Sequence, residues 1–75
     1  MTDKEKILII FARNLRMLRA AKKISQEKLA EMANITHQHL YRIENCKASP
    51  TITVIVNIAK ALDVDLNTLL PLDEL

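Results

Sequence analysis

The chain has 75 residues, 49% of them apolar, with one Phe, one Tyr, no Trp and no Gly. So short a chain forms a single domain, which we take to span residues 1–75, and its core must be aliphatic. A β-sheet protein would struggle to make hairpin turns without Gly, and one Cys cannot form an internal disulfide. The apolar run at 7–11 is too short to span a membrane. We therefore expect a soluble, cytoplasmic, all-α protein.

The net charge of +2 conceals an uneven distribution of charged residues. Residues 1–50 carry ten Lys or Arg against five Asp or Glu, whereas residues 51–75 carry one against four. A basic front half indicates an anionic partner, and an acidic, leucine-rich back half indicates a protein partner. The alternative is that these charges merely solvate the surface.

The spacing of apolar residues predicts a first helix from about residue 3 to residue 22. Thr2 and Glu5 have the spacing of a capping box, in which two side chains satisfy free N–H groups of the first turn. An apolar stripe at spacings of four, four and three follows. It comprises Ile7, Phe11, Leu15 and Leu18.

A second helix is predicted after Ser25, which is a favourable N-cap residue. Its inner face would consist of Leu29, Met32 and Ala33. Asn34 ends this helix, because Asn tolerates the left-handed backbone conformation of a helix end better than most residues with a side chain. Thr36 then caps a third helix that ends near Asn45. The residues of this third helix that face inward would be Leu40 and Ile43.

Pro50 marks the beginning of a fourth helix, because Pro lacks the N–H group that a first turn leaves unpaired. The apolar stripe of this helix would comprise Ile52, Ile55, Ile58 or Ala59, and Leu62. Asp65 can cap a short fifth helix that ends around Pro71. The pattern therefore predicts five helices with short connections.

The tight pair of helices at about 25–45 has the proportions of a helix-turn-helix, whose second helix lies in the DNA major groove. The stretches SQEKLAEMANITHQHLYRIEN and SPTITVIVNIAKALDVDLNTLL resemble the Cro/phage-repressor type of helix-turn-helix domain. The resemblance covers about residues 11–70 and implies a compact five-helix, lambda-repressor-like fold. It is carried by Ser25-Gln26-Glu27, Leu29-Ala30, Ile35-Thr36, Leu40, Ile43-Glu44, Pro50 and Ala59-x-x-Leu62-x-Val64.

Two positions depart from the pattern of this family. Its members usually have Gly in the turn where this chain has Asn34, and often Gly after the third helix where this chain has Cys46. Asn34 can take over the left-handed conformation. At the second position we expect Asn45, rather than Cys46, to adopt it.

The resemblance also implies two roles outside the third helix. Arg19 would pair with Glu44 and tie the first helix to the third. Gln26, at the first position of the second helix, would contact a DNA phosphate, because free N–H groups and the helix dipole favour an anion there. The alternative for Gln26 is a solvated side chain beside a cap.

The polar residues of the third helix would read the DNA sequence. Gln38 and Arg42 are four residues apart and share a face, and their side chains can bond adenine and guanine at two atoms each. We take these two as the strongest candidates for base contacts. The other candidates for contact with bases or phosphates are Thr36, His37, His39, Tyr41, Asn45 and Lys47.

Two histidines and a cysteine within ten residues raise the alternative of a metal site. His37 and His39 are two residues apart on a helix, so their side chains diverge by roughly 200°. Structural zinc requires four ligands, and no second Cys accompanies Cys46. We expect neither metal nor cofactor. Catalysis by Cys46 and a histidine is also disfavoured, because so small a bundle leaves little room for a substrate cleft.

The back half carries more apolar residues than five short helices can bury. We expect the surplus to form a two-fold dimer interface within about residues 52–75, with the run at 7–11 as a rival surface. The interface residues would be Val54, Val56, Leu66, Leu69, Leu70 and Leu72. Two-fold symmetry suits a protein that binds palindromic DNA.

The sequence thus predicts a homodimeric transcription regulator that binds a palindromic operator in double-stranded DNA and occludes or recruits RNA polymerase. The small members of the family that it resembles include controller proteins of restriction–modification systems and phage-type repressors. We expect such a compact regulator rather than a ligand-responsive one, because no sensor or protease domain follows the fifth helix. Of the two, a controller protein is the subtype we favour. An antitoxin-like module that binds protein with the same fold is the alternative from another class.

Overall fold

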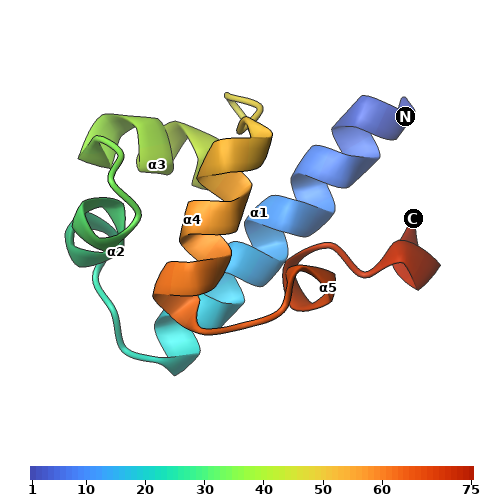
Figure 1. Cartoon of the computed structure of the whole chain (residues 1–75). Helices are drawn as coiled ribbons and strands as arrows, with labels where there is room; N and C mark the ends of the chain where they lie inside the picture. The colour runs from blue at the N-terminus through green and yellow to red at the C-terminus, as the bar shows by residue number, and fades with distance from the viewer.

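The computed structural model describes all 75 residues as five α-helices and one short 3-10 helix. The elements are α1 (Asp3–Ala21), α2 (Gln26–Met32), α3 (His37–Glu44), α4 (Ile52–Leu62), α5 (Leu66–Leu69) and η1 (Leu72–Glu74). Figure 1 shows α2 and α3 at one end of the molecule, with α5 and both termini toward the other. The expected all-α, five-helix fold is confirmed. None of the helices combines the length and the apolar character that crossing a membrane requires.

Hydroxyl side chains begin the first four helices. Each accepts a hydrogen bond from the backbone N–H three residues ahead, as Thr36 does from His39 at 3.0 Å. The four cap residues are Thr2, Ser25, Thr36 and Thr51. The cap of α4 is therefore Thr51, and the prediction that Pro50 stands in its first turn was wrong by two positions. Asp65 occupies the N-cap of α5 without a side-chain hydrogen bond.

The capping box of α1 predicts a measurable shift in the acidity of Glu5. Hydrogen bonds from the backbone N–H and then the hydroxyl of Thr2 to the carboxylate lower the pKa of Glu5 from its ordinary value of 4.5. The cap thus stabilises the folded state above the ordinary pKa, and this contribution disappears as the pH falls through the lowered value. An NMR titration should show the Glu5 pKa rising in Thr2→Ala and not in Thr2→Ser. Equal values in all three proteins would contradict the contribution of the Thr2 hydroxyl.

Four helices end with a residue that carries a side chain in the left-handed conformation. These residues are Lys23, Asn34, Cys46 and Asp63, with φ between 55° and 60°. After each, the next N–H bonds back to the carbonyl five residues before it, as Ile35 does to Ala30 at 3.0 Å, which is the Schellman motif. This chain has no Gly and therefore makes four helix ends of a type that usually contains one. A left-handed residue with a side chain costs about 1–2 kcal/mol in steric strain.

The turn after α3 corrects one expectation. Cys46, not Asn45, is left-handed, while Asn45 has a φ of −109°. The side-chain amide of Asn45 instead donates to the Tyr41 carbonyl at 2.7 Å. The Tyr41 carbonyl thus accepts hydrogen bonds from both the backbone and the side chain of Asn45, and the chain reverses one residue later, at Cys46.

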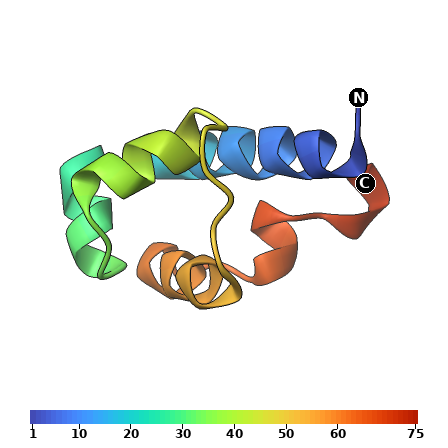
Figure 2. The ribbon, with the colours of Figure 1, turned by 90° about the horizontal axis from the view of Figure 1, so that it is seen from above.

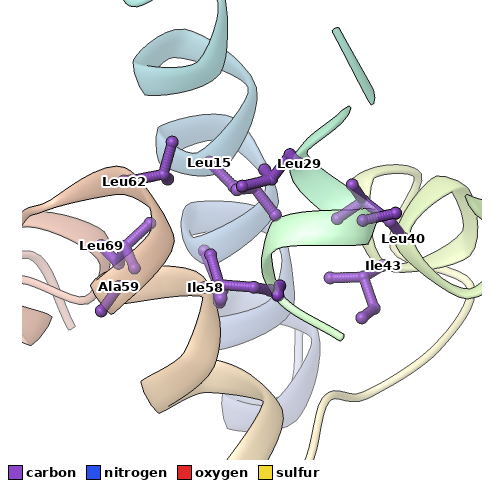
Figure 3. Packing of buried hydrophobic residues seen from close by; sticks show 11 residues of the cluster. Leu15, Leu29, Leu40, Ile43, Ile58, Ala59, Leu62 and Leu69 are labelled. Carbon is purple, nitrogen blue, oxygen red and sulfur yellow. The ribbon is translucent and has the colours of Figure 1, made fainter. Parts of the chain in front are cut away.

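The core is a single aliphatic cluster to which all five helices contribute (Figure 3). Leu15 of α1 and Leu29 of α2 lie within it and are fully buried. Its members are Phe11, Leu15, Leu29, Ala30, Ala33, Leu40, Ile43, Ile58, Ala59, Leu62 and Leu69. Most of the predicted stripes therefore meet in one place, which fixes the orientation of α3.

Three residues predicted to face the core are exposed instead. Ile7 lies on the N-terminal half of α1, which extends past α2 and α3 (Figure 1). Met32 and Ile52 are the last residue of α2 and the first of α4. At these positions the neighbouring helices leave the side chain uncovered. Ala30 is the residue that α2 buries in place of Met32.

Leu69 is a further correction, because it is fully buried in the core and cannot line a dimer interface. Its backbone carbonyl accepts a hydrogen bond from the side-chain amide of Asn14 at 3.0 Å. α5 is thereby fixed to α1. Leu70 is half-buried against the same core, whereas Leu66 and Leu72 are exposed.

The C-terminal segment returns to the beginning of the chain, and the two termini lie side by side in both views (Figures 1 and 2). The Glu74 carboxylate accepts a hydrogen bond from the Arg13 guanidinium at 2.7 Å. The ammonium group of Lys6 donates to the Leu75 carbonyl at 3.2 Å. These contacts join residues more than sixty positions apart in the sequence.

Candidate nucleic-acid interface

The unit formed by α2, the turn at 33–36 and α3 presents one helix face to solvent. Leu40 and Ile43 anchor α3 in the core, and Ala33 is buried in the turn. Ile35 packs partly against the core directly after left-handed Asn34. Because one side of α3 is held by apolar contacts, its polar residues are left on the opposite side.

A buried ion pair fixes the C-terminal end of α3 to α1. The guanidinium of Arg19 donates from Nε and Nη2 to the two carboxylate oxygens of Glu44, at 2.8 and 3.0 Å. The side chain of Glu44 is 2% exposed and that of Arg19 is 22% exposed. Arg16 donates to the backbone carbonyl of Glu44, and Arg19 also donates to the carbonyl of Ile24 at 3.1 Å. This geometry stabilises the position of α3 rather than providing a contact for DNA.

Gln26 joins this pair to the beginning of α3. Its amide nitrogen donates to Glu44 Oε1 at 3.1 Å, and its amide oxygen lies 2.8 Å from Nε2 of His37. The sequence indicated a phosphate contact for Gln26 and did not indicate these partners. No spacing rule could have found them, because the three residues lie on two helices, 11 and 18 positions apart.

Most of the candidate reading residues surround two shallow depressions on the outer side of α3. Thr36, Gln38, His39 and Arg42 line one of about 220 Å³. Gln26, His37, Gln38 and Tyr41 line the other, of about 440 Å³. Gln38 borders both and is therefore central to the surface. All of these residues are exposed except Gln26 and His39, which are half-buried.

Arg42, Asn45 and Lys47 lie together at the C-terminal end of α3 and are exposed. Arg42 Nη2 donates to the backbone carbonyl of Lys47 at 3.2 Å. The N–H of Lys47 in turn donates to the Arg42 carbonyl at 2.8 Å. The side chain of Arg42 is thus directed along the helix toward the loop, while the ammonium group of Lys47 has no partner in the protein.

The histidines and Cys46 do not converge. Cys46 Sγ lies 3.7 Å from the backbone carbonyl of Leu8 on α1, and His37 points toward Gln26. No group of three or more His, Cys, Asp or Glu side chains has the arrangement that would hold a metal ion. The two histidines instead flank the outer side of α3, His37 at one depression and His39 at the other.

Comparisons with known proteins agree with this geometry. A family model described as helix-turn-helix matches residues 15–69. The restriction-modification controller protein C.AhdI from Aeromonas hydrophila superposes with a TM-score of 0.80 at 32% sequence identity, over 83% of this chain and 94% of that one. A hypothetical transcription factor, NHTF, from Neisseria superposes with a TM-score of 0.83 at 27% sequence identity. The match covers 93% of this chain and 80% of that one.

An HTH_3 family transcriptional regulator from Vibrio cholerae gives a TM-score of 0.85 at 24% identity. That match covers 95% of this chain but 40% of the other, so it supports the fold alone. A comparison with curated protein sequences gave no significant match.

Proposed function

This chain belongs to the helix-turn-helix family HTH_3, and we propose from that premise that it is a DNA-binding transcription regulator. More specifically, we propose that it acts as a homodimer on a palindromic operator, as a controller protein of a restriction–modification system. The observation that carries the proposal is the exposed polar side of α3, which the buried Arg19–Glu44 pair holds in a fixed position.

In this proposal α3 enters the major groove and its polar side faces the base edges. Gln38 and Arg42 contact bases, and His37, His39 and Tyr41 lie beside them. Contacts with the DNA backbone come from residues at the two ends of the helix-turn-helix. These contacts come from the backbone N–H of Gln26, the hydroxyl of Thr36, and the side chains of Asn45 and Lys47.

The test of this function is the selection of bound sites from random double-stranded DNA by the purified protein. We expect an enriched motif made of two half-sites in inverted orientation, about one helical turn apart. Weak binding with no enriched motif would contradict the regulator proposal. It would leave a protein-interaction module as the alternative.

We propose that the two-fold interface lies on α4, α5 and η1. Val54 and Val56 are half-buried, and Leu66 and Leu72 remain exposed now that Leu69 is assigned to the core. Val56 and Leu66 border an open depression of about 610 Å³ between α4 and α5. A second copy that covers these apolar side chains would use the same patch on both subunits, as a two-fold dimer does.

The two candidate dimer surfaces can be separated by one pair of variants. Leu66 is 49% exposed and Ile9, in the rival apolar run, is 44% exposed, so the substitutions are matched. Leu66→Lys should weaken dimerisation by tenfold or more, because it places a charge among apolar side chains, whereas Ile9→Lys should not. Sedimentation equilibrium measures both. Weaker dimerisation in Ile9→Lys but not in Leu66→Lys would move the interface to α1. A strictly monomeric wild type would refute the homodimer.

The controller-protein assignment is supported by the likeness to C.AhdI over almost all of that chain. A regulator of this type would act by occluding or recruiting RNA polymerase at a promoter that overlaps its operator. Methyltransferase and endonuclease genes beside its own gene would support the assignment, whereas phage genes would favour a phage-type repressor.

A further inference from the structure

We propose that Gln26 is a positioning residue that holds His37 as the tautomer protonated on Nε2. Neutral His37 would then present Nδ1 to the major groove as a hydrogen-bond acceptor. It would prefer adenine or cytosine, the bases that carry an amino group there. This inference rests on the proposed function, since it requires α3 to lie in the groove.

The first step concerns the orientation of the Gln26 amide. The two carboxylate oxygens of Glu44 accept hydrogen bonds from Arg19, and a carboxylate in an ion pair has no hydrogen to donate. The group that faces Glu44 Oε1 at 3.1 Å must therefore be the NH₂ of Gln26, not its carbonyl. The chemistry of the buried pair thus selects one of the two amide orientations.

The second step concerns the imidazole of His37. With its NH₂ directed at Glu44, Gln26 turns its carbonyl oxygen toward Nε2 of His37, at 2.8 Å. A carbonyl oxygen only accepts hydrogen bonds, so Nε2 must carry the hydrogen. In the neutral ring Nδ1 is then unprotonated, and the structure gives it no protein partner.

The third step concerns what Nδ1 can recognise. His37 is exposed and lines the depression it shares with Gln26, Gln38 and Tyr41 on the outer side of α3. In the major groove the amino groups of adenine N6 and cytosine N4 are donors, whereas guanine and thymine present acceptors or a methyl group. An acceptor fixed at Nδ1 therefore pairs with adenine or cytosine and is unfavourable opposite guanine or thymine.

The tautomer is tested by long-range ¹H–¹⁵N correlation spectra of the imidazoles in the full chain, at a pH at which they are neutral. We expect His37 to be protonated on Nε2 alone. His39, whose ring has no hydrogen-bond partner in the protein, provides the internal control and should average over both tautomers. In Gln26→Ala the His37 signals should move toward those of His39. Protonation on Nδ1 in the wild type, or signals unaffected by Gln26→Ala, would overturn the inference.

The base preference is tested by selection from random DNA with the wild type and three variants. One position in each half-site should favour adenine or cytosine roughly 2- to 10-fold, the range expected for one hydrogen bond. His37→Ala and Gln26→Ala should lose this preference. His37→Gln should keep it, because its amide can donate to Gln26 and direct its carbonyl oxygen at the base. Each variant is used only if its spectrum shows the native fold.

The outcomes separate this inference from the proposed function. An enriched motif that contains no position sensitive to both His37→Ala and Gln26→Ala would overturn the role of His37 and leave the regulator proposal intact. A preference for guanine or thymine at the sensitive position would also overturn it. If no motif is enriched by the wild type, the proposed function itself fails, and this inference fails with it.

Discussion

Replacing Arg19 with Ala is expected to lower the free energy of unfolding by about 3–5 kcal/mol. The reason is that the Glu44 carboxylate stays buried, with its side chain 2% exposed, and loses the two hydrogen bonds at 2.8 and 3.0 Å that compensate its charge. A domain of this length has roughly 4–11 kcal/mol of stability in total. Urea denaturation followed by circular dichroism should show a large fall in the transition midpoint.

The matched control is Arg13→Ala. Arg13 also pairs with a glutamate, Glu74, at 2.7 Å, but both side chains are 45% exposed. Ion pairs in such positions contribute about 0–1 kcal/mol, because water screens the charges and solvates each partner when it is left alone. Equal losses in the two variants would mean that burial of Glu44 does not determine the stability, contrary to the role we assign to the pair.

Replacing Gln38 or Arg42 with Ala is expected to remove most of the preference for the operator over random DNA. Each bidentate contact with a base discriminates by about 1–3 kcal/mol, or roughly 5- to 150-fold in the ratio of the two dissociation constants. Both residues are exposed and border the same depression on α3, so their loss should leave the fold unchanged. Fluorescence anisotropy with operator and scrambled duplexes measures the ratio.

Lys47→Ala provides the control for this experiment, since a contact with phosphate carries no sequence information. It should weaken binding to both duplexes by a similar factor and reduce the dependence of affinity on salt. If Gln38→Ala and Arg42→Ala both retain the wild-type ratio, the reading surface has been assigned to the wrong residues.

Much of the fold follows from local signals in the sequence. Hydroxyl residues at the N-caps and the spacing of apolar residues placed α2 and α3 within one or two residues of their observed bounds. Exposure at helix ends could not be predicted in the same way. Ile7 and Ile52 fit their stripes, but whether a neighbouring helix extends far enough to cover them depends on tertiary packing.

Three of the four helix ends carry a sequence signal for the left-handed residue. At these ends the residue directly after the left-handed one is apolar and packs against the core. These residues are Ile24, Ile35 and Val64. An apolar residue after a polar one at the end of a stripe therefore marks the Schellman motif even without Gly. The end of α3 lacks this signal, because Lys47 follows Cys46, and there the left-handed position was assigned to the wrong residue.

The candidate site was predictable where a single helix determines it. Gln38 and Arg42 are on one side of α3 because they are four residues apart, and the structure places them together. The Arg19–Glu44 pair was expected from the family resemblance, not from spacing. The contacts of Gln26 depend on how α2 and α3 cross. Within α5, no pattern in four residues could show that Leu69 rather than Leu66 faces inward.

Leu69 is the last fully buried residue of the chain, and the segment from Pro71 onward is held to α1 by exposed polar contacts. Separating this segment costs far less than disrupting the core. We therefore expect it to open locally many times for each global unfolding event and its amide hydrogens to exchange early. Leu72 lies on this segment, whereas Leu66 lies before it. A partner that covers both must order the end of the chain as it binds. In the proposed dimer, the Arg13–Glu74 contact would therefore change the affinity of a surface that neither residue needs to touch.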